Sequence, residues 1–384
     1  MKTIGIMSMQ RIYNYGSSLQ AYALRKLVEE STNDALVHYL DYTPGPPLVK
    51  SPDIKRNGGG RLRRTFEKVS EYSKTEARIL DKIRFFNHKS HYASKYFPLI
   101  GISAAPRHEA NIDLQIIGSD EVFNCVQDNT NVGYTRDLFG HESKAKKLIS
   151  YAASFGNTTL EKIDAYKIRK ELEEDFLKFD AISVRDFNSQ EIVSQLIGER
   201  PEIHLDPTLV YPLSQDSKIP GTRQRSFKYI IAYGYSGRFN DVENQAVRKY
   251  ANHIGAKVLA FGGLQSSADE FIDCDPFALL AYFRDAEAVI TDTFHGTIFA
   301  IINEVPFATI IRKSHGVGYG NSEKLGYLLS SMNLECRALN DPSTLPELME
   351  EAVDFSPVRV LREHQRARTL NYLRSAIDLG VVND

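Results

Sequence analysis

Cysteine is scarce in this sequence, and its spacing excludes several classes of protein. Cys125, Cys274 and Cys336 are the only cysteines among 384 residues, and they lie far apart. They form no CxxC pair and no zinc-ligand spacing, so we expect neither a structural zinc site nor a disulfide framework. A chain without disulfides fits a reducing compartment, which makes the cytoplasm the expected location.

Long apolar runs and an excess of one charge are also lacking. No apolar stretch approaches the roughly 20 residues of a membrane-spanning helix. The first ten residues, MKTIGIMSMQ, lack the apolar core of about 7–15 residues that marks a secretory signal. The formal net charge of −2 gives no reason to expect nucleic acid as a partner. These absences again favour a cytoplasmic protein.

The chain is long enough for two domains of about 150–200 residues, and both halves alternate strands with helices, as parallel α/β proteins do. We place the boundary in the polar, proline-containing segment 211–226. The sequence therefore predicts a Rossmann-like domain over 1–212 and a second one over 213–356. It also predicts a C-terminal helix, 357–384, that packs back on the first domain. Within the first domain, we expect one long helix over 160–179.

A compact unit near the C-terminus carries the first candidate site residue. Residues 288–290 and 307–311 read as buried strands, and 296–302 as the helix between them. His295 lies where the first strand ends and the helix begins, and such helix N-termini bind anions in parallel sheets. A histidine there can contact a phosphate or carboxylate and move a proton. A surface or capping histidine is the structural alternative.

The loop after the first strand has no G-x-G-x-x-G, so the dinucleotide fingerprint is absent. Asn14, Tyr15 and Gly16 in this loop could shape a turn or line a sugar site. A helix is expected to follow from about Leu19.

Two neighbouring carboxylates, Asp120 and Glu121, come after the strand 113–118, and Ser119 precedes them. Carboxylates at a strand end suit acid–base chemistry or the binding of sugar hydroxyls. Helix capping by Ser119 or Asp120 is the alternative. Arg185 follows the strand 181–184 and could pair with an anion or form a structural ion pair.

The segment 51–95 is strongly basic, with 12 Lys and Arg against five Asp and Glu, a local charge of +7. We expect a helical excursion of the N-terminal domain over 51–97. Its cations could form a face for a lipid pyrophosphate or a membrane surface. A solvated helix without a partner is the structural alternative.

Six motifs, in order along nearly the whole chain, resemble those of the polysaccharide pyruvyl transferase family. The resemblance rests on NYGSSLQAYAL at Asn14–Leu24 (family NYGG-LQAYAL), GSDEVFN at Gly118–Asn124 (GSDQVWN), SYAASFG at Ser150–Gly156 (SYAASFG), SVRD at Ser183–Asp186 (SVRE), DPTL at Asp206–Leu209 (DPTLL) and TDTFHGT at Thr291–Thr297 (TDSFHG).

The resemblance implies two Rossmann-like domains in a GT-B-type architecture, as in glycosyltransferases. It also implies transfer of pyruvate from phosphoenolpyruvate to two hydroxyls of a sugar, as a ketal, with release of phosphate. No metal or nucleotide cofactor is implied, because phosphoenolpyruvate is the donor substrate. We expect the acceptor to be a precursor of a bacterial surface polysaccharide linked to undecaprenyl pyrophosphate. A peripheral membrane contact through 51–95 would fit such an acceptor.

Roles follow for the candidate residues. His295 is expected to be the general acid or a phosphate ligand, and Asp120 to hold or deprotonate the acceptor hydroxyl. Arg185 is expected to pair with the phosphate or carboxylate of the donor. The backbone of Phe294, His295 and Gly296, with Thr297, is expected to form an anion cradle. The other expected substrate-binding residues are Arg312 and Lys313 as further anion ligands, and Thr293, Asn14, Tyr15, Gly16, Ser119 and Glu121.

The sequence departs from the family pattern at Ser17, Glu121 and Phe123, which replace Gly, Gln and Trp, so the acceptor sugar is left open.

Two other functions remain possible interpretations of the sequence. A sugar-nucleotide glycosyltransferase would need a base pocket and a ribose-binding acid, and Glu270 and Asp273 fall in no such pattern. A non-catalytic sugar- or lipid-binding protein is the second, although the retained Asp120, Arg185 and His295 argue against it.

Overall fold

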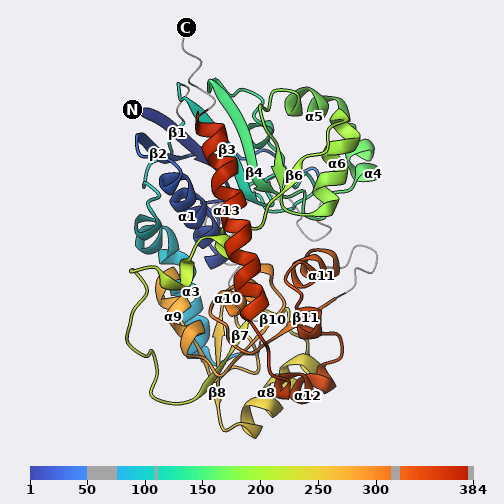
Figure 1. Ribbon diagram of the computed structural model, residues 1–384. Helices are drawn as coiled ribbons and strands as arrows, with labels where there is room; N and C mark the ends of the chain where they lie inside the picture. The colour runs from blue at the N-terminus through green and yellow to red at the C-terminus, as the bar shows by residue number, and fades with distance from the viewer. Residues whose placement is uncertain (50–75, 109–110, 313–320, 379–384) are drawn as a thin grey trace. The chain divides into compact units, whose positions relative to one another are not determined.

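The computed structural model describes residues 1–49, 76–108, 111–312 and 321–378 (Figure 1). The chain divides into two compact units. Unit 1 consists of Met1–Arg56, Phe97–Tyr211 and Arg362–Asp384, and unit 2 of Asn57–Tyr96 and Pro212–Leu361.

The described strands of unit 1 form a six-stranded parallel sheet in the order β2-β1-β3-β4-β5-β6. The order reverses between β1 and β3, and ligands of such sheets bind beyond the carboxyl ends of the strands at this switch point. The strands are β1 (Lys2–Met7), β2 (Ala35–Leu40), β3 (Leu114–Asp120), β4 (Lys147–Ala153), β5 (Ser183–Val184) and β6 (Glu202–Ile203). The α-helices are α1 (Tyr15–Glu30), α4 (Leu160–Ala165), α5 (Arg169–Phe176), α6 (Phe187–Ile197), α7 (Pro207–Val210) and most of α13 (Ser356–Asp378).

The core of unit 1 follows from the alternation of side chains along the strands. Met7 and Ile117 are neighbours in the β1–β3 register, and both belong to an apolar cluster with Phe176 of α5 and Ile192 of α6. Successive side chains of a strand point to opposite faces. The alternating buried residues of β1 therefore face the other side of the sheet, which makes unit 1 a three-layer α/β structure.

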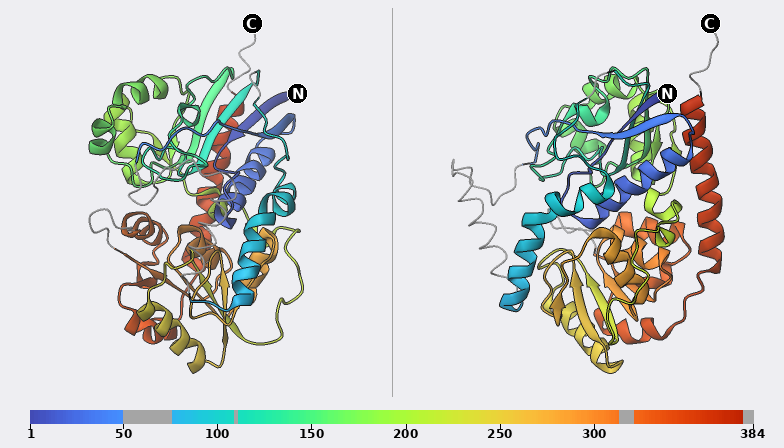
Figure 2. Two further views of the ribbon diagram at one scale, coloured as in Figure 1. Left: turned by 180° about the vertical axis from the view of Figure 1, so that it is seen from behind. Right: turned by 90° about the vertical axis from the view of Figure 1, so that its left-hand side faces the viewer.

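Helix α13, the red helix in Figure 2, contacts unit 1 through polar groups along its second half. The hydroxyl of Tyr372 donates a hydrogen bond to Ser150 O at 2.7 Å, and Thr369 Oγ1 lies 3.0 Å from the hydroxyl of Tyr151. Near the end of the helix, Lys2 Nζ donates to Ile377 O at 2.6 Å. The C-terminal helix thus packs on β1 and β4.

The described strands of unit 2 also form a six-stranded parallel sheet, in the Rossmann order β12-β11-β10-β7-β8-β9. Its switch point lies between β7 and β10. The strands are β7 (Tyr229–Tyr233), β8 (Lys257–Phe261), β9 (Glu270–Phe271), β10 (Ala288–Thr291), β11 (Phe307–Ile310) and β12 (Ala338–Leu339). The α-helices are α3 (Ile79–Tyr96), α8 (Asp241–His253), α9 (Pro276–Asp285), α10 (Phe294–Ile302), α11 (Ser322–Ser331) and α12 (Leu345–Glu350).

Two helices differ from the sequence-based expectation. The single helix expected over 160–179 is two helices, α4 and α5, because Lys167 adopts a left-handed φ of +59° between them. Helix α1 begins at Tyr15, not near Leu19, because the side chain of Asn14 accepts the hydrogen bond of Ser17 N at 2.7 Å and caps the helix.

The basic excursion was expected to belong to the N-terminal domain, but its helix, α3, is part of unit 2. The ring of Phe85 packs edge-on against Phe271 of β9, with 5.3 Å between centroids. Asp81 Oδ1 accepts a hydrogen bond from Phe271 N at 3.1 Å, and His88 Nδ1 lies 2.7 Å from Asp273 Oδ1. These side chains of α3 thus contact the edge strand β9 and the segment that follows it. The sequence pattern did not reveal this strand. Residues 51–75 of the excursion lie outside the described residues.

Among the described residues, none of the helices combines the length and the apolar character that crossing a membrane requires.

Candidate active site

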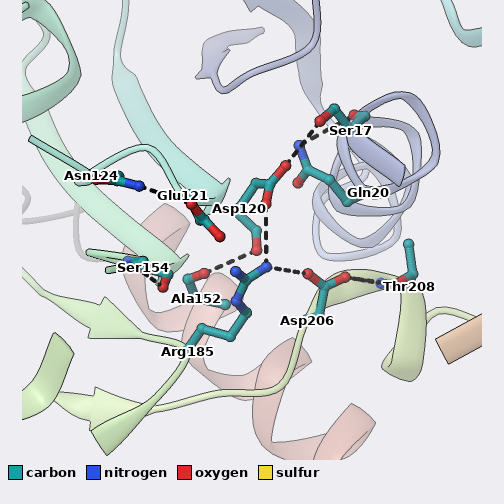
Figure 3. Close-up of polar contacts among 12 residues, drawn as sticks. Ser17, Gln20, Asp120, Glu121, Asn124, Ala152, Ser154, Arg185, Asp206 and Thr208 are labelled. Carbon is teal, nitrogen blue, oxygen red and sulfur yellow. Dashed lines mark hydrogen bonds and ion pairs between the residues drawn. The ribbon is translucent and has the colours of Figure 1, made fainter. Parts of the chain in front are cut away.

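Asp120 ends β3 at the switch point of unit 1 (Figure 3). It has a left-handed φ of +73°, which is uncommon for a residue other than glycine. Asp120 Oδ2 accepts a hydrogen bond of 3.0 Å from Ser17 Oγ, which comes from the first turn of α1. Because β1 and β3 are neighbours, the turn after β1 and the end of β3 meet here, and the carboxylate is held in one orientation.

Arg185 lies on the other side of Asp120, directly after β5, and its side chain is only 5% exposed. Arg185 Nη1 donates to Asp206 Oδ2 at 3.0 Å and to Asp120 Oδ1 at 3.4 Å. Burial acts to lower the pKa of Arg185, but the charges of Asp120 and Asp206 outweigh it, so that the pKa is raised. The guanidinium is therefore a permanent positive charge between two carboxylates.

Glu121 is oriented by a second set of contacts. Its Oε2 accepts a hydrogen bond of 2.9 Å from Asn124 Nδ2. Gly156 packs against this pair with φ +56°, and a Cβ at Gly156 would lie 2.6 Å from both Glu121 Oε2 and Asn124 Nδ2. A residue other than glycine would displace the carboxylate, so the SYAASFG motif supports the position of Glu121.

Four other residues were expected near these carboxylates, and the structure places them in different surroundings. Asn14 caps α1, and Gly16 lies in its first turn. Tyr15 is 1% exposed and belongs to the core, and Ser119 is fully buried with its Oγ donating to Ala152 O at 2.9 Å. The side chains of Tyr15 and Ser119 thus support the fold, and they do not line a surface of unit 1.

His295 lies in the first turn of α10, at the switch point of unit 2. Thr293 caps the helix, since its Oγ1 accepts from Gly296 N at 3.0 Å. A Cβ at Gly296 would lie 2.2 Å from Thr291 Oγ1, so this close packing requires glycine. The imidazole of His295 packs near the ring of Phe299, with 6.1 Å between ring centroids. The turn therefore presents His295 at a helix N-terminus, as the sequence predicted.

Thr297, expected in the anion cradle, is instead part of the helix–sheet contact. It is fully buried, its Oγ1 donates to Thr293 O at 3.0 Å, and the same oxygen lies 2.9 Å from Thr309 Oγ1 of β11. Because the hydroxyl contacts both Thr293 O and Thr309 Oγ1, Thr297 fixes α10 on the sheet.

Arg312 forms the centre of an ion-pair network in unit 2 whose two carboxylates are buried. Its Nη1 donates to Asp292 Oδ2 at 2.6 Å, and its Nη2 donates to Glu243 Oε2 at 2.6 Å. Arg238 Nη1 lies 3.7 Å from the same Asp292 oxygen. Burial raises the pKa of Asp292, although the charges of Arg238 and Arg312 oppose the rise. These ion pairs are the structural alternative for Arg312, and its expected contact with an anion stays a prediction. Lys313 lies outside the described residues.

Sequence reasoning missed three members of this network, Arg238, Glu243 and Asp292. The signal that could have found Arg238 is the glycine-containing turn, Gly234–Gly237, directly after the buried strand β7. Asp292 similarly follows β10. Because β7 and β10 flank the switch point, both residues lie at the edge of the sheet where ligands bind.

Among the described residues, no group of three or more His, Cys, Asp and Glu side chains is arranged to hold a metal ion.

Solved structures with a similar fold include a protein from Listeria monocytogenes assigned as a UDP-N-acetylglucosamine 2-epimerase. It has a TM-score of 0.51 and 10% identity, over 99% of this chain and 98% of that one. Another UDP-N-acetylglucosamine 2-epimerase has a TM-score of 0.50 and 9% identity, over 100% of this chain and 97% of that one. At such identities, the likeness shows the fold alone, two Rossmann-like units of the GT-B type.

No curated protein sequence matches the chain. The family model of polysaccharide pyruvyl transferase, in contrast, matches residues 14–314. This range includes Asp120 and Arg185 of unit 1 and the complete β10–α10 turn of unit 2 that carries His295. The chain therefore belongs to the polysaccharide pyruvyl transferase family.

Proposed function

We propose that the protein transfers pyruvate from phosphoenolpyruvate to two hydroxyls of a sugar and forms a cyclic ketal in a precursor of a bacterial surface polysaccharide. The observation that carries this proposal is the turn between β10 and α10. It presents His295 at a helix N-terminus, at the switch point of a Rossmann-like sheet. Helix N-termini favour phosphate and carboxylate, and phosphoenolpyruvate has both groups.

His295 is proposed to act as the general acid. Protonation of the methylene carbon of phosphoenolpyruvate develops positive charge on the neighbouring carbon, which a sugar hydroxyl then attacks. The second hydroxyl displaces phosphate at the same carbon and closes the ketal. The reaction consumes two hydroxyls and one phosphoenolpyruvate and releases one phosphate, with no oxidation or reduction. A positioned imidazole can supply the proton near neutral pH.

Asp120 is proposed to be the base for the acceptor hydroxyl. The bonds from Ser17 and Arg185 hold its carboxylate in one orientation, which a general base requires. Arg185, which donates to the carboxylates of both Asp120 and Asp206, is proposed to position Asp120 in addition to its expected contact with the donor. Glu121, oriented by Asn124, is a second candidate for binding acceptor hydroxyls.

The acceptor is proposed to be a sugar carried on undecaprenyl pyrophosphate at the cytoplasmic face of the membrane. The basic composition of 51–95 supports this, because a pyrophosphate-linked lipid in an anionic membrane attracts Lys and Arg. No metal or nucleotide cofactor is part of the proposal, since the donor substrate itself supplies the activated pyruvyl group.

The test is an assay with the purified protein, phosphoenolpyruvate and a panel of synthetic and lipid-linked galactosides, glucosides and mannosamines. We expect phosphate release that depends on the acceptor, together with an acceptor product that mass spectrometry identifies as a pyruvyl ketal. His295→Ala is the matched inactive control. Sugar transfer from a UDP-sugar, with no reaction of phosphoenolpyruvate, would establish a glycosyltransferase. Sugar binding without turnover of either donor would establish a binding protein.

A further inference from the structure

Helix α3 exposes large apolar side chains on one face. Ile79 is 77% exposed, Leu80 66%, Ile83 52% and Phe86 43%. An α-helix turns by about 100° per residue, so these spacings of three and four place the four side chains in one stripe over the first two turns. Large apolar side chains that gather in this way on a surface mark an interaction site, whereas single exposed ones do not.

The opposite face of α3 is buried, which fixes the stripe in its outward position. Asp81 and Phe85 contact Phe271 of β9, and the hydroxyl of Tyr96 donates to Asp273 Oδ1 at 2.6 Å. Turning the stripe inward would break these contacts and expose buried aromatic rings. Figure 2 shows α3 in cyan as a long, straight helix. The stripe is therefore a fixed part of the surface of unit 2.

Cations border the stripe along both edges. By the same rotation of about 100° per residue, Lys82 and Lys89 lie on one side of it and Arg84 and Lys95 on the other. Arg84 also forms ion pairs with Glu270 at 2.8 Å and with Asp81 at 3.6 Å. Arg78, directly before the helix, pairs with Asp81 at 2.7 Å. Asp81 is the one acid within α3, and it is buried on the opposite face.

We propose that the outward face of α3 docks on an anionic membrane surface. An apolar stripe with cationic edges is the pattern of a helix that lies in the membrane interface, with its apolar side chains among the acyl chains and its cations at the lipid phosphates. The positive charge on both edges favours anionic lipid over an apolar protein partner or a second copy of this positively charged face. The proposal concerns binding alone and does not depend on catalysis.

A fluorescence experiment tests the proposal directly, because the chain contains no tryptophan. Phe86→Trp places a single reporter in the stripe. Phe187→Trp is the matched control, since Phe187 is 62% exposed at the start of α6 in unit 1. With vesicles of phosphatidylcholine and phosphatidylglycerol, we expect the emission of the Phe86→Trp variant to shift to the blue and that of the Phe187→Trp variant to stay unchanged. Vesicles of phosphatidylcholine alone should have little effect.

Sedimentation with the same vesicles gives an independent measurement. Ile79→Ser combined with Ile83→Ser should weaken vesicle binding by about tenfold or more, because two apolar side chains are lost from the buried interface. Val242→Ser, at a side chain that is 60% exposed on α8, should bind as the wild type does. All the substituted residues are exposed, so each variant is expected to fold, which thermal unfolding checks.

Three results would overturn the proposal. Blue-shifted emission of the Phe86→Trp variant without vesicles would mean that protein already covers the stripe. Equal shifts with both kinds of vesicle, or unchanged sedimentation of the double serine variant, would also contradict it. Because vesicle binding requires neither phosphoenolpyruvate nor an acceptor, any of these results would leave the proposed pyruvyl transfer intact. Conversely, vesicle binding by a protein without pyruvyltransferase activity would leave the docking surface established.

Discussion

The guanidinium of Arg185 is bound to the carboxylate of Asp206 by a hydrogen bond of 3.0 Å, with both side chains buried. Asp206 is itself fixed, since its Oδ1 accepts from Thr208 N at 3.0 Å and from Thr208 Oγ1 at 2.6 Å. The DPTL motif thus provides the anchor for the arginine of the SVRD motif. This ion pair is the structural role that was left open as the alternative for Arg185. The contact of Arg185 with phosphoenolpyruvate stays a prediction.

Kinetics of Arg185→Ala should separate these roles. Loss of a charge-assisted contact with the donor would raise the KM for phosphoenolpyruvate about 10- to 100-fold with a smaller change in kcat, and this is the expected result. If Arg185 only positions Asp120, kcat should fall while this KM stays constant. Because the variant leaves buried carboxylates without their cation, we also expect it to lose about 3–5 kcal/mol of stability. Steady-state kinetics at saturating acceptor and urea unfolding provide the measurements.

Substitution of His295 should affect turnover more than donor binding. His295→Ala should lower kcat by about 10²- to 10⁴-fold if the imidazole is the general acid. His295→Gln keeps a hydrogen-bonding side chain but cannot supply the proton, so calorimetry should detect phosphoenolpyruvate binding without turnover. Near-normal turnover of His295→Gln would move the acid role to another residue, and Asp120 and Glu121 would be the next candidates.

Two helix glycines should respond in opposite ways to alanine. Gly296→Ala places its Cβ 2.2 Å from Thr291 Oγ1 and 2.6 Å from Thr293 Oγ1, so we expect a loss of about 1–3 kcal/mol. Gly326 lies within α11 with nothing within 4 Å of its Cβ position, so Gly326→Ala should gain about 0.5–1 kcal/mol. Thermal unfolding of both variants checks the pair. A harmless Gly296→Ala would show that the β10–α10 turn can relax.

His204 should make the protein sensitive to acid. Burial, with a smaller effect of the Arg368 charge, lowers the pKa of His204 from 6.5 to about 4. Since the unfolded chain binds the proton first, the stability that this group contributes is complete above pH 6.5. It is lost as the pH falls towards 4, by up to about 3 kcal/mol. His204→Gln cannot titrate, so its unfolding free energy should fall less over this range. Parallel curves for variant and wild type would contradict the prediction.

Donor binding should not need a divalent metal ion. The sequence has no metal-ligand spacing around its candidate residues, and phosphoenolpyruvate can be bound by cations and helix N–H groups. Calorimetric titration with phosphoenolpyruvate should therefore give the same affinity in EDTA as in Mg²⁺. Affinity that disappears with the chelator and returns with the metal would contradict this.

Local pattern was sufficient for much of the fold. Buried strands such as β10, found where residues 288–290 were predicted, contain short apolar runs, and the helix after β10 is set by a threonine cap before it and Pro306 beyond it. The position of His295 follows from the same short-range signals. The family could also be recognised, because each motif is a short segment whose residues are close in sequence.

The sequence alone did not reveal the short edge strands, since the two residues of β6, β9 or β12 are too few to show a period. It also could not place α3, because the partners of its buried face come nearly 200 residues later. The network of Arg238, Glu243, Asp292 and Arg312 joins residues that follow β7, β10 and β11 with one from α8. Local composition determined which segments become strands and helices. Long-range packing alone decided which charges meet, because parallel strands bring distant carboxyl ends to one edge of a sheet.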